Sequence, residues 1–372
     1  MEHSSPATQA SRLPLVLHYT GYDEDYGGVT VTIKRLAAVG AWRTLLGLNA
    51  GGVQRREPRL DVVEFPRVDA ERGGRHLLVA GWRVAWHARR WLRGNPDGIF
   101  HGHSRAGALA AALLRSAGET RVLATVHVFG RQRWWYRQLA RLLDGRIFWL
   151  SPRMKEYYGL GRGTWAECLP DCVSGIEIAQ RKPRDAARIF GAVGPIVAVK
   201  EWRALVEAWA QVPAEVRRNL KLVHIGGPRM DDRHAEAEAL RRFAAERGVA
   251  DSIEWRPRSE SLEKFWNEID CYVGTSPREA FGVAALEALA AGVPLLVPSA
   301  AGTSDLVEEC HGGWCFDGGA PSLAGAIERS AQPGAWRGWS PDVAALGRFS
   351  AAAVAARHAE IYRTLLRRAS NA

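Results

Sequence analysis

Two glutamates, Glu279 and Glu287, stand in the segment SPREAFGVAALEALAAGVP (276–294) with seven residues between them. The alanine- and leucine-rich stretch around Glu287 predicts a helix that stops at Gly292 and Pro294, and Glu279 falls in the loop ahead of it. On one continuous helix the two positions would lie about 12 Å apart along the axis and about 80° apart around it, so they cannot hold one atom together. A ligand that reached both would have to be long, as a nucleotide sugar is.

The start of this predicted helix suits a diphosphate, because its backbone N–H groups are unpaired and its dipole favours negative charge. The N–H groups concerned belong to Ala280, Phe281 and Gly282. The competing interpretation is a surface carboxylate at each position, and it also explains Glu279, since acidic residues favour helix starts. It explains Glu287 less well, because a charge in an apolar stretch needs a partner.

Two histidines stand at the ends of short apolar runs. IFHGHSRAG (99–107) places His103 after a predicted strand, and ATVHVFG (124–130) ends another strand at His127. A single histidine on an apolar strand is usually a structural residue. Two at the carboxyl ends of adjacent predicted strands favour a functional role.

Short β-branched runs alternate with helical patterns along the chain, which predicts parallel α/β units. The alternation pauses at the polar segment 174–188, the best candidate linker, and then restarts. We therefore expect two Rossmann-like, doubly wound parallel-sheet domains that face each other across a cleft, with ligands at the carboxyl ends of the strands. The expected division is a disordered tail over 1–12, an N-terminal domain over 13–175, a C-terminal domain over 188–345, and a C-terminal helix over 346–372 that could cross back to the N-terminal domain.

The expected elements follow from the same pattern. The expected strands are 13–19, 44–49, 98–103, 121–128, 146–151, 188–194, 220–227, 252–256, 270–276 and 294–299. The expected helices are 29–40, 76–93, 106–117, 132–143, 201–211, 233–247, 261–268, 281–291, 321–331 and 349–368.

The chain of 372 residues has a net charge of +10 and 15 tryptophans, which suggests an anionic partner such as nucleic acid, a membrane surface or a phosphorylated substrate. Charge and aromatic residues coincide in GWRVAWHARRWLR (81–93) and RQRWWYRQLARLL (131–143). Each stretch has the composition of an interfacial amphipathic helix. The alternative is a helix that packs its tryptophans inward and leaves a solvated arginine face.

Compartment and cysteine chemistry can also be inferred. Five cysteines without a CxxC pair indicate buried apolar residues in a reducing compartment rather than a zinc site. No run approaches the roughly 18 apolar residues of a membrane span, and the first residues lack the apolar core of a secretory signal. We therefore expect a cytoplasmic protein, peripheral on the inner face of the cell membrane if the two basic stretches bind it.

The longer segment SPREAFGVAALEALAAGVPLLVPSAAGTSDLVE (276–308) resembles the Glu-x7-Glu segment of retaining glycosyltransferases with the GT-B fold, especially the family called GT4. It shares Phe-Gly after the first glutamate, Glu-Ala-Leu-Ala-x-Gly-x-Pro from the second, and a later Gly-Thr-Ser. The resemblance implies that Glu279 contacts the donor sugar hydroxyls and Glu287 the ribose hydroxyls of the nucleotide. It also implies that Gly302 and Thr303 lie near the phosphates.

Other matches extend over the whole chain. VGPIVAVKEWRALVEAW (193–209) places Lys200 on the lysine that, by this resemblance, neutralises the donor diphosphate. YGGVTVTIKRLA (26–37) resembles the N-terminal glycine loop, where Gly27 and Gly28 would let the backbone approach the phosphates or the acceptor. His103 falls on the histidine that faces the transferred sugar, and His127 matches a neighbouring strand end.

The chain departs from the family pattern at three places. Pro195 replaces the usual arginine, Glu201 the usual glycine, and Asp171-Cys172 the commoner Asn-Gly. One of two expected phosphate cations is therefore missing. The candidate replacements are Arg203, Arg256 and Arg278, and the candidate contacts of the nucleobase are Arg256 and Ser259.

The resemblance implies transfer of a sugar from a nucleoside-diphosphate sugar to a sugar, polysaccharide-precursor or lipid-linked acceptor, with retention of anomeric configuration, in cell-surface polysaccharide or glycolipid assembly. The C-terminal domain would bind the donor and the N-terminal domain the acceptor. No cofactor and no metal is expected, because GT-B enzymes stabilise the leaving group with cations and a helix dipole. The Asp-x-Asp pattern at 23–25, typical of metal-binding GT-A enzymes, lies in the first loop and indicates a solvated acidic turn.

Two alternatives stay open. A nucleotide-sugar 2-epimerase shares the GT-B fold and would convert its nucleotide sugar without an acceptor. A basic nucleic-acid-binding protein would explain the charge, but the chain has no helix-turn-helix, RNA-recognition or zinc-finger signature.

Overall fold

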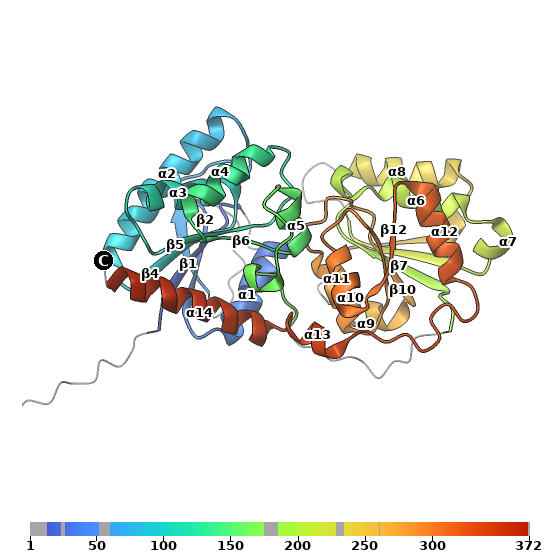
Figure 1. Ribbon diagram of the computed structural model, residues 1–372. Coiled ribbons are helices and arrows are strands. Elements are labelled where there is room, and N and C mark those ends of the chain that lie inside the picture. The colour runs from blue at the N-terminus through green and yellow to red at the C-terminus, as the bar shows by residue number, and fades with distance from the viewer. Residues whose placement is uncertain are drawn as a thin grey trace, which may run out of the picture.

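The computed structural model describes residues 13–23, 27–51, 60–174, 185–227, 234–259 and 261–370. These residues form two six-stranded sheets with the orders β3-β2-β1-β4-β5-β6 and β12-β11-β10-β7-β8-β9, each covered by helices on both faces (Figure 1). Every strand pair is parallel. The predicted pair of doubly wound parallel sheets is confirmed.

The element bounds are as follows. The N-terminal sheet and its helices comprise β1 (Leu15–Tyr19), α1 (Gly28–Val39), β2 (Arg43–Asn49), β3 (Asp61–Phe65), α2 (Arg75–Gly94), β4 (Gly98–Gly102), α3 (Arg105–Ser116), β5 (Val122–Val126), α4 (Arg133–Leu143), β6 (Ile147–Trp149), α5 (Pro152–Tyr157) and the 3-10 helix η1 (Trp165–Glu167). The second sheet and its helices comprise β7 (Ile189–Val193), the 3-10 helix η2 (Ala198–Lys200), α6 (Trp202–Gln211), α7 (Ala214–Arg217), β8 (Lys221–Ile225), α8 (His234–Glu246), the 3-10 helix η3 (Ala250–Ser252), β9 (Ile253–Arg256), α9 (Glu263–Glu268), β10 (Cys271–Val273), α10 (Val283–Ala290), β11 (Leu295–Pro298), α11 (Ser304–Cys310), β12 (Gly313–Phe316) and α12 (Ala320–Ser330). The chain ends with α13 (Val343–Gly347) and α14 (Ala351–Ser370).

The strand order of each sheet reverses beside its first strand. β1 lies between β2 and β4, and β7 lies between β10 and β8. Successive connections diverge from such a point, so a crevice forms outside the carboxyl ends of the central strands. The central strands are apolar runs buried on both faces, as parallel sheets covered by helices require.

Close packing of α3 on β4 fixes the end of that strand. A Cβ atom on Gly102 would lie 2.4 Å from the carbonyl carbon of Gly107 in α3, so any larger residue would separate the two elements. Ser104 caps α3 by accepting a hydrogen bond from the N–H of Gly107. His103 lies between Gly102, which packs closely against α3, and Ser104, which caps α3, so both contacts fix its position.

The C-terminal helix α14 returns to the N-terminal domain, where it lies beside α1 (Figure 1). Its buried Val354 and Tyr362 share an apolar cluster with Trp42. The chain crosses between the domains beside Val173, whose N–H donates to the carbonyl of Phe349 at 3.0 Å. Residues far apart in sequence therefore join the two domains at one place.

The sequence pattern missed one strand of each sheet. β3 and β12 each lie at one edge of their sheet, opposite β6 and β9, and only the last residue of each is buried. An outer strand is covered less completely, so its apolar signal is weaker. The short helices α5, α7, α11 and α13 were also not predicted, and the helix expected from 281 begins at Val283. The tail 1–12 and most of the linker 174–188 lie outside the described residues.

Two further properties concern the whole described chain. The cysteines are free, four of them buried and Cys315 half-buried, which confirms their apolar role. Within the described ranges, no helix has the length and apolar character needed to cross a membrane.

Candidate active site

Lys200 and Glu279 meet at the carboxyl edge of the C-terminal sheet. Lys200 follows β7 and Glu279 follows β10, and these strands are neighbours. The Lys200 Nζ atom lies 2.5 Å from the Glu279 Oε2 atom, and the two side chains are 25% and 28% exposed. The hydroxyls of Thr275 and Ser276 tie the loops together by donating to the carbonyls of Lys200 (2.6 Å) and Val199 (2.9 Å). The predicted sugar and diphosphate contacts thus form one partly exposed ion pair.

The loop after β11 supports Glu279 from behind. The N–H of Gly302 donates to the carbonyl of Glu279 at 2.7 Å. A Cβ atom on Gly302 would lie 1.9 Å from the carbonyl oxygen of Ala280, so only glycine permits this contact. Thr303 is buried, and its hydroxyl has no hydrogen-bond partner. The predicted phosphate-loop residues therefore contact the Glu279 loop directly.

The start of α10 is shaped by Gly282 and Phe281. Gly282 precedes the helix with φ +86°, a conformation that favours glycine, and its Cβ position lies 2.3 Å from the Thr303 methyl group. Phe281 is buried against Trp165 and Phe349, with ring centroids 6.3 and 5.6 Å away. Phe281, in the predicted donor-binding loop, therefore packs against residues at the junction of the two domains.

Glu287 is half-buried one turn inside α10 and pairs with Arg35 of α1. Arg35 also donates to the carbonyl of Cys172 at 2.7 Å. Gly28 begins α1, and a Cβ atom added to it would lie 3.8 Å from the Val283 side chain at the start of α10. The helix that follows the predicted N-terminal glycine loop therefore runs beside the helix that follows Glu279. Gly27, with φ +109°, faces open space.

Three histidines form a hydrogen-bonded chain at the carboxyl ends of β1, β4 and β5. His18 Nδ1 lies 2.9 Å from His103 Nε2, and His103 Nδ1 lies 2.9 Å from His127 Nε2. The chain continues toward Asp171, whose Oδ1 atom lies 4.0 Å from His127 Nδ1. Both nitrogens of His103 are therefore occupied by other histidines, whereas His127 Nδ1 has no hydrogen-bond partner.

Burial keeps this chain uncharged. Desolvation lowers the pKa of His18 and of His127 to about 3, and it holds the pKa of His103 well below its usual value. Burial also raises the pKa of Asp171 to about 7, although the Thr32 hydroxyl donates to its Oδ1 atom at 3.0 Å and lowers it.

The ring nitrogens of His18, His101 and His103 come within 4.8 Å of one another, close enough for a shared ion. His101 already bonds the Tyr362 hydroxyl at 2.9 Å and the Thr125 hydroxyl at 2.8 Å. Of the six nitrogens, His18 Nε2 alone has no hydrogen bond. An ion would have to displace the hydrogen bonds of the other two rings.

Two of the three arginines that could replace the missing phosphate cation have partners other than Lys200 and Glu279. Arg256 is held by Glu268 and Glu254, with shortest distances of 2.6 Å to each. The guanidinium of Arg203 lies 3.7 Å from the Phe243 ring centroid. Arg278 is exposed, and the Ser259 hydroxyl donates to the carbonyl of Ser261. Roles of these residues in donor binding stay predictions.

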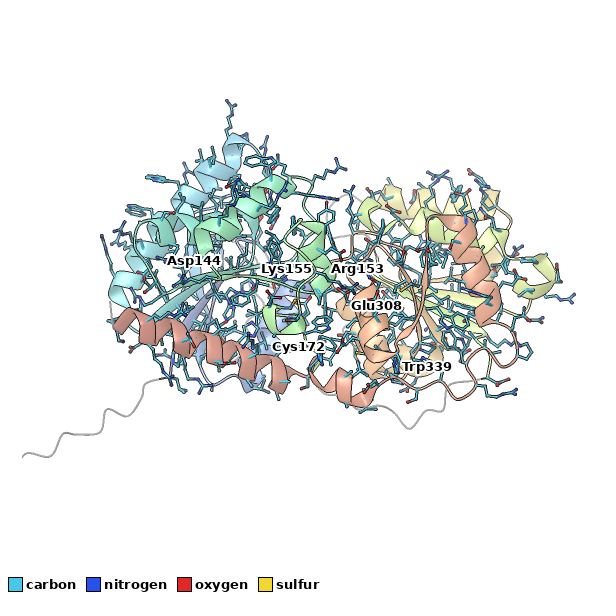
Figure 2. The ribbon with its side chains drawn as sticks, viewed as in Figure 1. Asp144, Arg153, Lys155, Cys172, Glu308 and Trp339 are labelled. Atoms are coloured by element: carbon cyan, nitrogen blue, oxygen red, sulfur yellow. The ribbon has the colours of Figure 1, made fainter. Side chains whose placement is uncertain are left out.

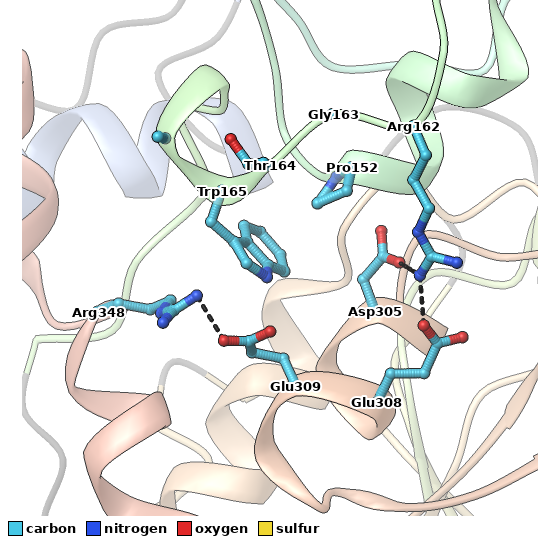
Figure 3. A pocket seen from close by; sticks show the side chains of 10 residues that line it. Pro152, Arg162, Gly163, Thr164, Trp165, Asp305, Glu308, Glu309 and Arg348 are labelled. Atoms are coloured by element: carbon cyan, nitrogen blue, oxygen red, sulfur yellow. Dashed lines mark hydrogen bonds and ion pairs between the residues drawn. The ribbon is translucent and has the colours of Figure 1, made fainter.

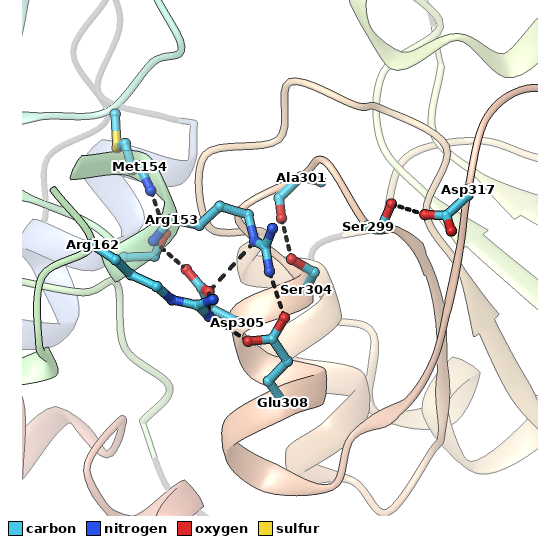
Figure 4. A network of polar contacts seen from close by, with 10 residues as sticks. Arg153, Met154, Arg162, Ser299, Ala301, Ser304, Asp305, Glu308 and Asp317 are labelled. Atoms are coloured by element: carbon cyan, nitrogen blue, oxygen red, sulfur yellow. Dashed lines mark hydrogen bonds and ion pairs between the residues drawn. The ribbon is translucent and has the colours of Figure 1, made fainter. Parts of the chain in front are cut away.

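A cavity of 580 Å³ lies at the junction of the two domains, and neither Lys200 nor Glu279 lines it (Figure 3). Its lining includes Trp165, Glu309 and Arg348. Beside it, Arg153 and Arg162 of the N-terminal domain bind Asp305 and Glu308 of α11 (Figure 4). Arg153 and Glu308 come from different domains and lie close together where the two domains meet (Figure 2). Two arginines of one domain thus meet two carboxylates of the other, so these ion pairs join the two domains.

Sequence reasoning did not single out Arg35, His18 or the Asp171 carboxylate as site residues. His18 stands within an apolar strand, and its place opposite His101 follows only from the β1–β4 register. Asp171 was noted as a departure from the family pattern, which was the available signal. Of the Asp-x-Asp pattern, Asp23 accepts from Asn49 and pairs with Arg67, and positions 24 and 25 lie outside the described residues.

Comparison with known proteins adds to this geometry. Residues 175–331 match the family model described as Glycosyl transferases group 1. The D-inositol 3-phosphate glycosyltransferase of Acidothermus cellulolyticus is 34% identical over 182 residues, which cover 43% of this chain and 40% of that protein. The chain spans less than half the length of the curated relatives it matches.

Solved structures match almost the whole chain. Anabaena Alr3699/HepE, in complex with UDP and glucose, has a TM-score of 0.68 at 16% identity, covering 93% of this chain and 98% of that one. The UDP-forming α,α-trehalose-phosphate synthase of Burkholderia xenovorans has a TM-score of 0.72 at 14% identity, covering 94% and 100%. At these identities the likeness establishes the fold, and the family resemblance drawn from the Glu-x7-Glu segment is confirmed by the family model. The chain therefore has the GT-B fold, and its residues 175–331 are similar to the family described as Glycosyl transferases group 1.

Proposed function

We propose that this protein transfers a glycosyl group from a nucleoside-diphosphate sugar to an acceptor hydroxyl, with retention of the anomeric configuration. The acceptor is a sugar, a polysaccharide precursor or a lipid-linked glycan of the cell surface. The observation that carries the proposal is the Lys200–Glu279 ion pair at the carboxyl edge of the C-terminal sheet, with Glu287 farther along the adjoining helix.

The arrangement supplies contacts along the length of a nucleotide sugar. Glu279 accepts hydrogen bonds from the sugar hydroxyls, and Glu287 accepts them from the ribose. The diphosphate lies between them, near the Lys200 ammonium and the N–H groups at the start of α10, where the helix dipole favours an anion. A solved neighbour of the same fold holds UDP-glucose, which supports this class of donor.

The proposed chemistry places positive charge where the leaving group becomes negative. As the bond between the anomeric carbon and the diphosphate breaks, Lys200 and the α10 N-terminus stabilise the phosphate oxygens. The acceptor oxygen attacks from the face that the diphosphate leaves, and its proton passes to a diphosphate oxygen. This front-face route gives retention without a carboxylate nucleophile opposite Glu279.

A membrane-bound acceptor is favoured by one surface. Trp82 and Trp86 of α2 and Trp134 of α4 are 64%, 51% and 58% exposed. Both helices pack beside α3 on the same side of the N-terminal domain (Figure 1). Exposed arginines accompany these tryptophans in 81–93 and 131–143, so this surface combines apolar anchors with positive charge. We propose that this surface binds anionic lipids on the inner face of the cell membrane.

The experiment is to incubate the protein with UDP-glucose and other nucleotide sugars, with and without candidate acceptors, and to measure free nucleoside diphosphate and the anomeric configuration of the product. Acceptor-dependent release with a retained product is expected. An inverted product would contradict the proposed stereochemistry. Conversion of the nucleotide sugar without acceptor would instead support the epimerase.

A further inference from the structure

The chain His18–His103–His127 leaves each imidazole little freedom in where it carries its proton. Both N···N contacts measure 2.9 Å, so each is a hydrogen bond in which one nitrogen has the proton and the other accepts it. A neutral imidazole carries one proton on its two nitrogens. Placing the proton in one contact therefore places it in the other.

Only two arrangements satisfy both contacts with neutral rings. In the first, Nδ1 carries the proton in all three rings, and the last N–H, at His127, faces Asp171 at 4.0 Å. In the second, Nε2 carries the proton in all three rings. His127 then has a bare Nδ1 atom, and the His18 Nε2–H group is buried without an acceptor. The two arrangements differ at the ends of the chain.

Asp171 lies at the end where they differ. Its side chain is 8% exposed, as is that of His127, so little water screens the two groups from each other. As a carboxylate, Asp171 attracts the His127 Nδ1–H group and favours the first arrangement. As a neutral acid, it no longer attracts that group, and its own O–H can face the bare Nδ1 atom of the second arrangement.

The other charged and titratable groups around this end are defined. From α1, Arg35 faces Asp171 and favours its anion, and the Thr32 hydroxyl does the same by hydrogen bonding. From the C-terminal domain, Glu279 disfavours the anion. Around the three rings stand His101 of β4 and His358 of α14, both held neutral by burial, which lowers their pKa. Tyr362 of α14 packs against His18.

We propose that Asp171 sets the tautomer of His18, His103 and His127 as one unit, and thereby decides whether the buried His127 Nδ1 atom that faces it carries a proton. Asp171 is thus a positioning residue that acts through His127. In passing from the first arrangement to the second, His127 releases its Nδ1 proton to Asp171, one proton moves along each N···N contact, and His18 takes one proton from the medium at Nε2. The proposal goes beyond the proposed function and does not rest on it, because no step in it involves the donor or the acceptor.

The test is histidine nitrogen NMR on the full chain labelled with ¹⁵N-histidine, recorded from pH 5.5 to 8.5 without ligand. The three histidines should exchange their protonated nitrogen together in one step, while all three stay neutral. Asp171→Asn keeps the size of the side chain and the bond from Thr32 but cannot ionise, so it should abolish the step. Asp23→Asn, on a carboxylate held by Asn49 and Arg67, is the matched control and should preserve it.

A second variant tests the same idea if Asp171→Asn fails to fold. Thr32→Val removes a hydrogen bond that favours the anion, so it should move the step to higher pH. Tautomers that stay constant over the whole range in the wild type, or a step that survives in Asp171→Asn, would overturn the proposal. Calorimetric titration with nucleoside diphosphates separates this outcome from the proposed function, because the tautomer step requires no ligand and nucleotide binding requires no step.

Discussion

Arg35 of α1 pairs with Glu287 of α10, so an arginine of the N-terminal domain covers the carboxylate assigned to the donor ribose. Glu287 stands in an apolar stretch, where a charge needs a partner, and Arg35 is that partner. Under the proposed function, the ribose hydroxyls would replace this pair or share Glu287 with Arg35. The proposed function thus links the contact between the domains to the affinity for the donor through the Glu287 side chain.

Replacing Arg35 should release Glu287 for the nucleotide. Arg35→Met is expected to bind nucleoside diphosphates about two- to fivefold more tightly, because a partly exposed ion pair contributes about 0.5–1 kcal/mol that binding otherwise has to overcome. Isothermal titration calorimetry measures the change, and Arg67→Met, which breaks the exposed pair with Asp23, is the control. Tenfold weaker binding of the Arg35 variant would instead show that Arg35 contacts the nucleotide.

Lys200 should matter for the diphosphate far more than other lysines of the same domain. Lys200→Met is expected to lower kcat/KM by about a hundredfold or more, the usual loss when a group that stabilises transition-state charge is removed. Lys221→Met is the matched control, since Lys221 pairs with Glu254 at 2.6 Å at the opposite end of β8 from the carboxyl edge. Equal effects of the two substitutions on steady-state kinetics would refute the role of Lys200.

The buried histidines predict acid lability. Burial lowers the pKa of His18 and His127 to about 3 and that of His358 to about 4, so the unfolded chain binds protons below about pH 6.5 that the folded chain does not. Each such group lowers the free energy of unfolding by up to about 1.4 kcal/mol for every pH unit of acidification. Asp171 and Glu71 act in the opposite direction between about pH 4 and 7, because burial raises the pKa of each to about 7, as it also raises that of Asp305. The histidines whose pKa is lowered by burial outnumber these carboxylates, since they also include His101, His103 and His224.

Urea unfolding from pH 7.5 to 4.5 checks this expectation. The free energy of unfolding should fall on acidification in the wild type, and His358→Gln should reduce the slope. His76→Gln, at an exposed position of α2, should leave it unchanged. A stability that does not vary with pH across this range would mean that the histidines are not buried in their neutral form.

The exposed tryptophans predict membrane binding that depends on salt. The protein is expected to co-sediment with vesicles of anionic lipid at low salt and to be released as salt screens the arginines. Combining Trp82→Ser with Trp86→Ser should weaken binding about fivefold or more, because two apolar anchors are lost. Val343→Ser, at a position 53% exposed in α13, is the control. No sedimentation at low salt would exclude this surface as a membrane site.

Much of the fold could be predicted from the sequence, because buried parallel strands are continuous apolar runs. β3 and β12 could not, since each is a short outer strand whose residues are incompletely buried. The helix start at Val283 also differs from the expected 281, because Gly282 takes a left-handed conformation that no pattern of apolar residues reveals.

The part of the candidate site that depends on the order of the strands could be predicted from the sequence. Lys200 and Glu279 follow central strands, so their meeting at one edge follows from the order of the sheet. Arg35 and Glu287 stand 252 residues apart and meet only through the packing of two domains. The histidine chain likewise depends on the register of β1 against β4, which places His18 opposite His101.

The central claim is that one nucleotide sugar reaches from Glu279 to Glu287, and one calorimetric measurement tests it most directly. Glu279→Gln and Glu287→Gln are titrated with UDP and UDP-glucose, then with other nucleoside diphosphates and their sugars, beside the wild type. Glu287→Gln should weaken the nucleoside diphosphate and its sugar alike, by about tenfold or more, since a lost hydrogen bond to a charged group costs about 1.5–3 kcal/mol. Glu279→Gln should weaken the nucleotide sugar without weakening the free diphosphate. Unchanged affinity of Glu287→Gln for both ligands, or no binding of any nucleoside diphosphate to the wild type, would contradict the account.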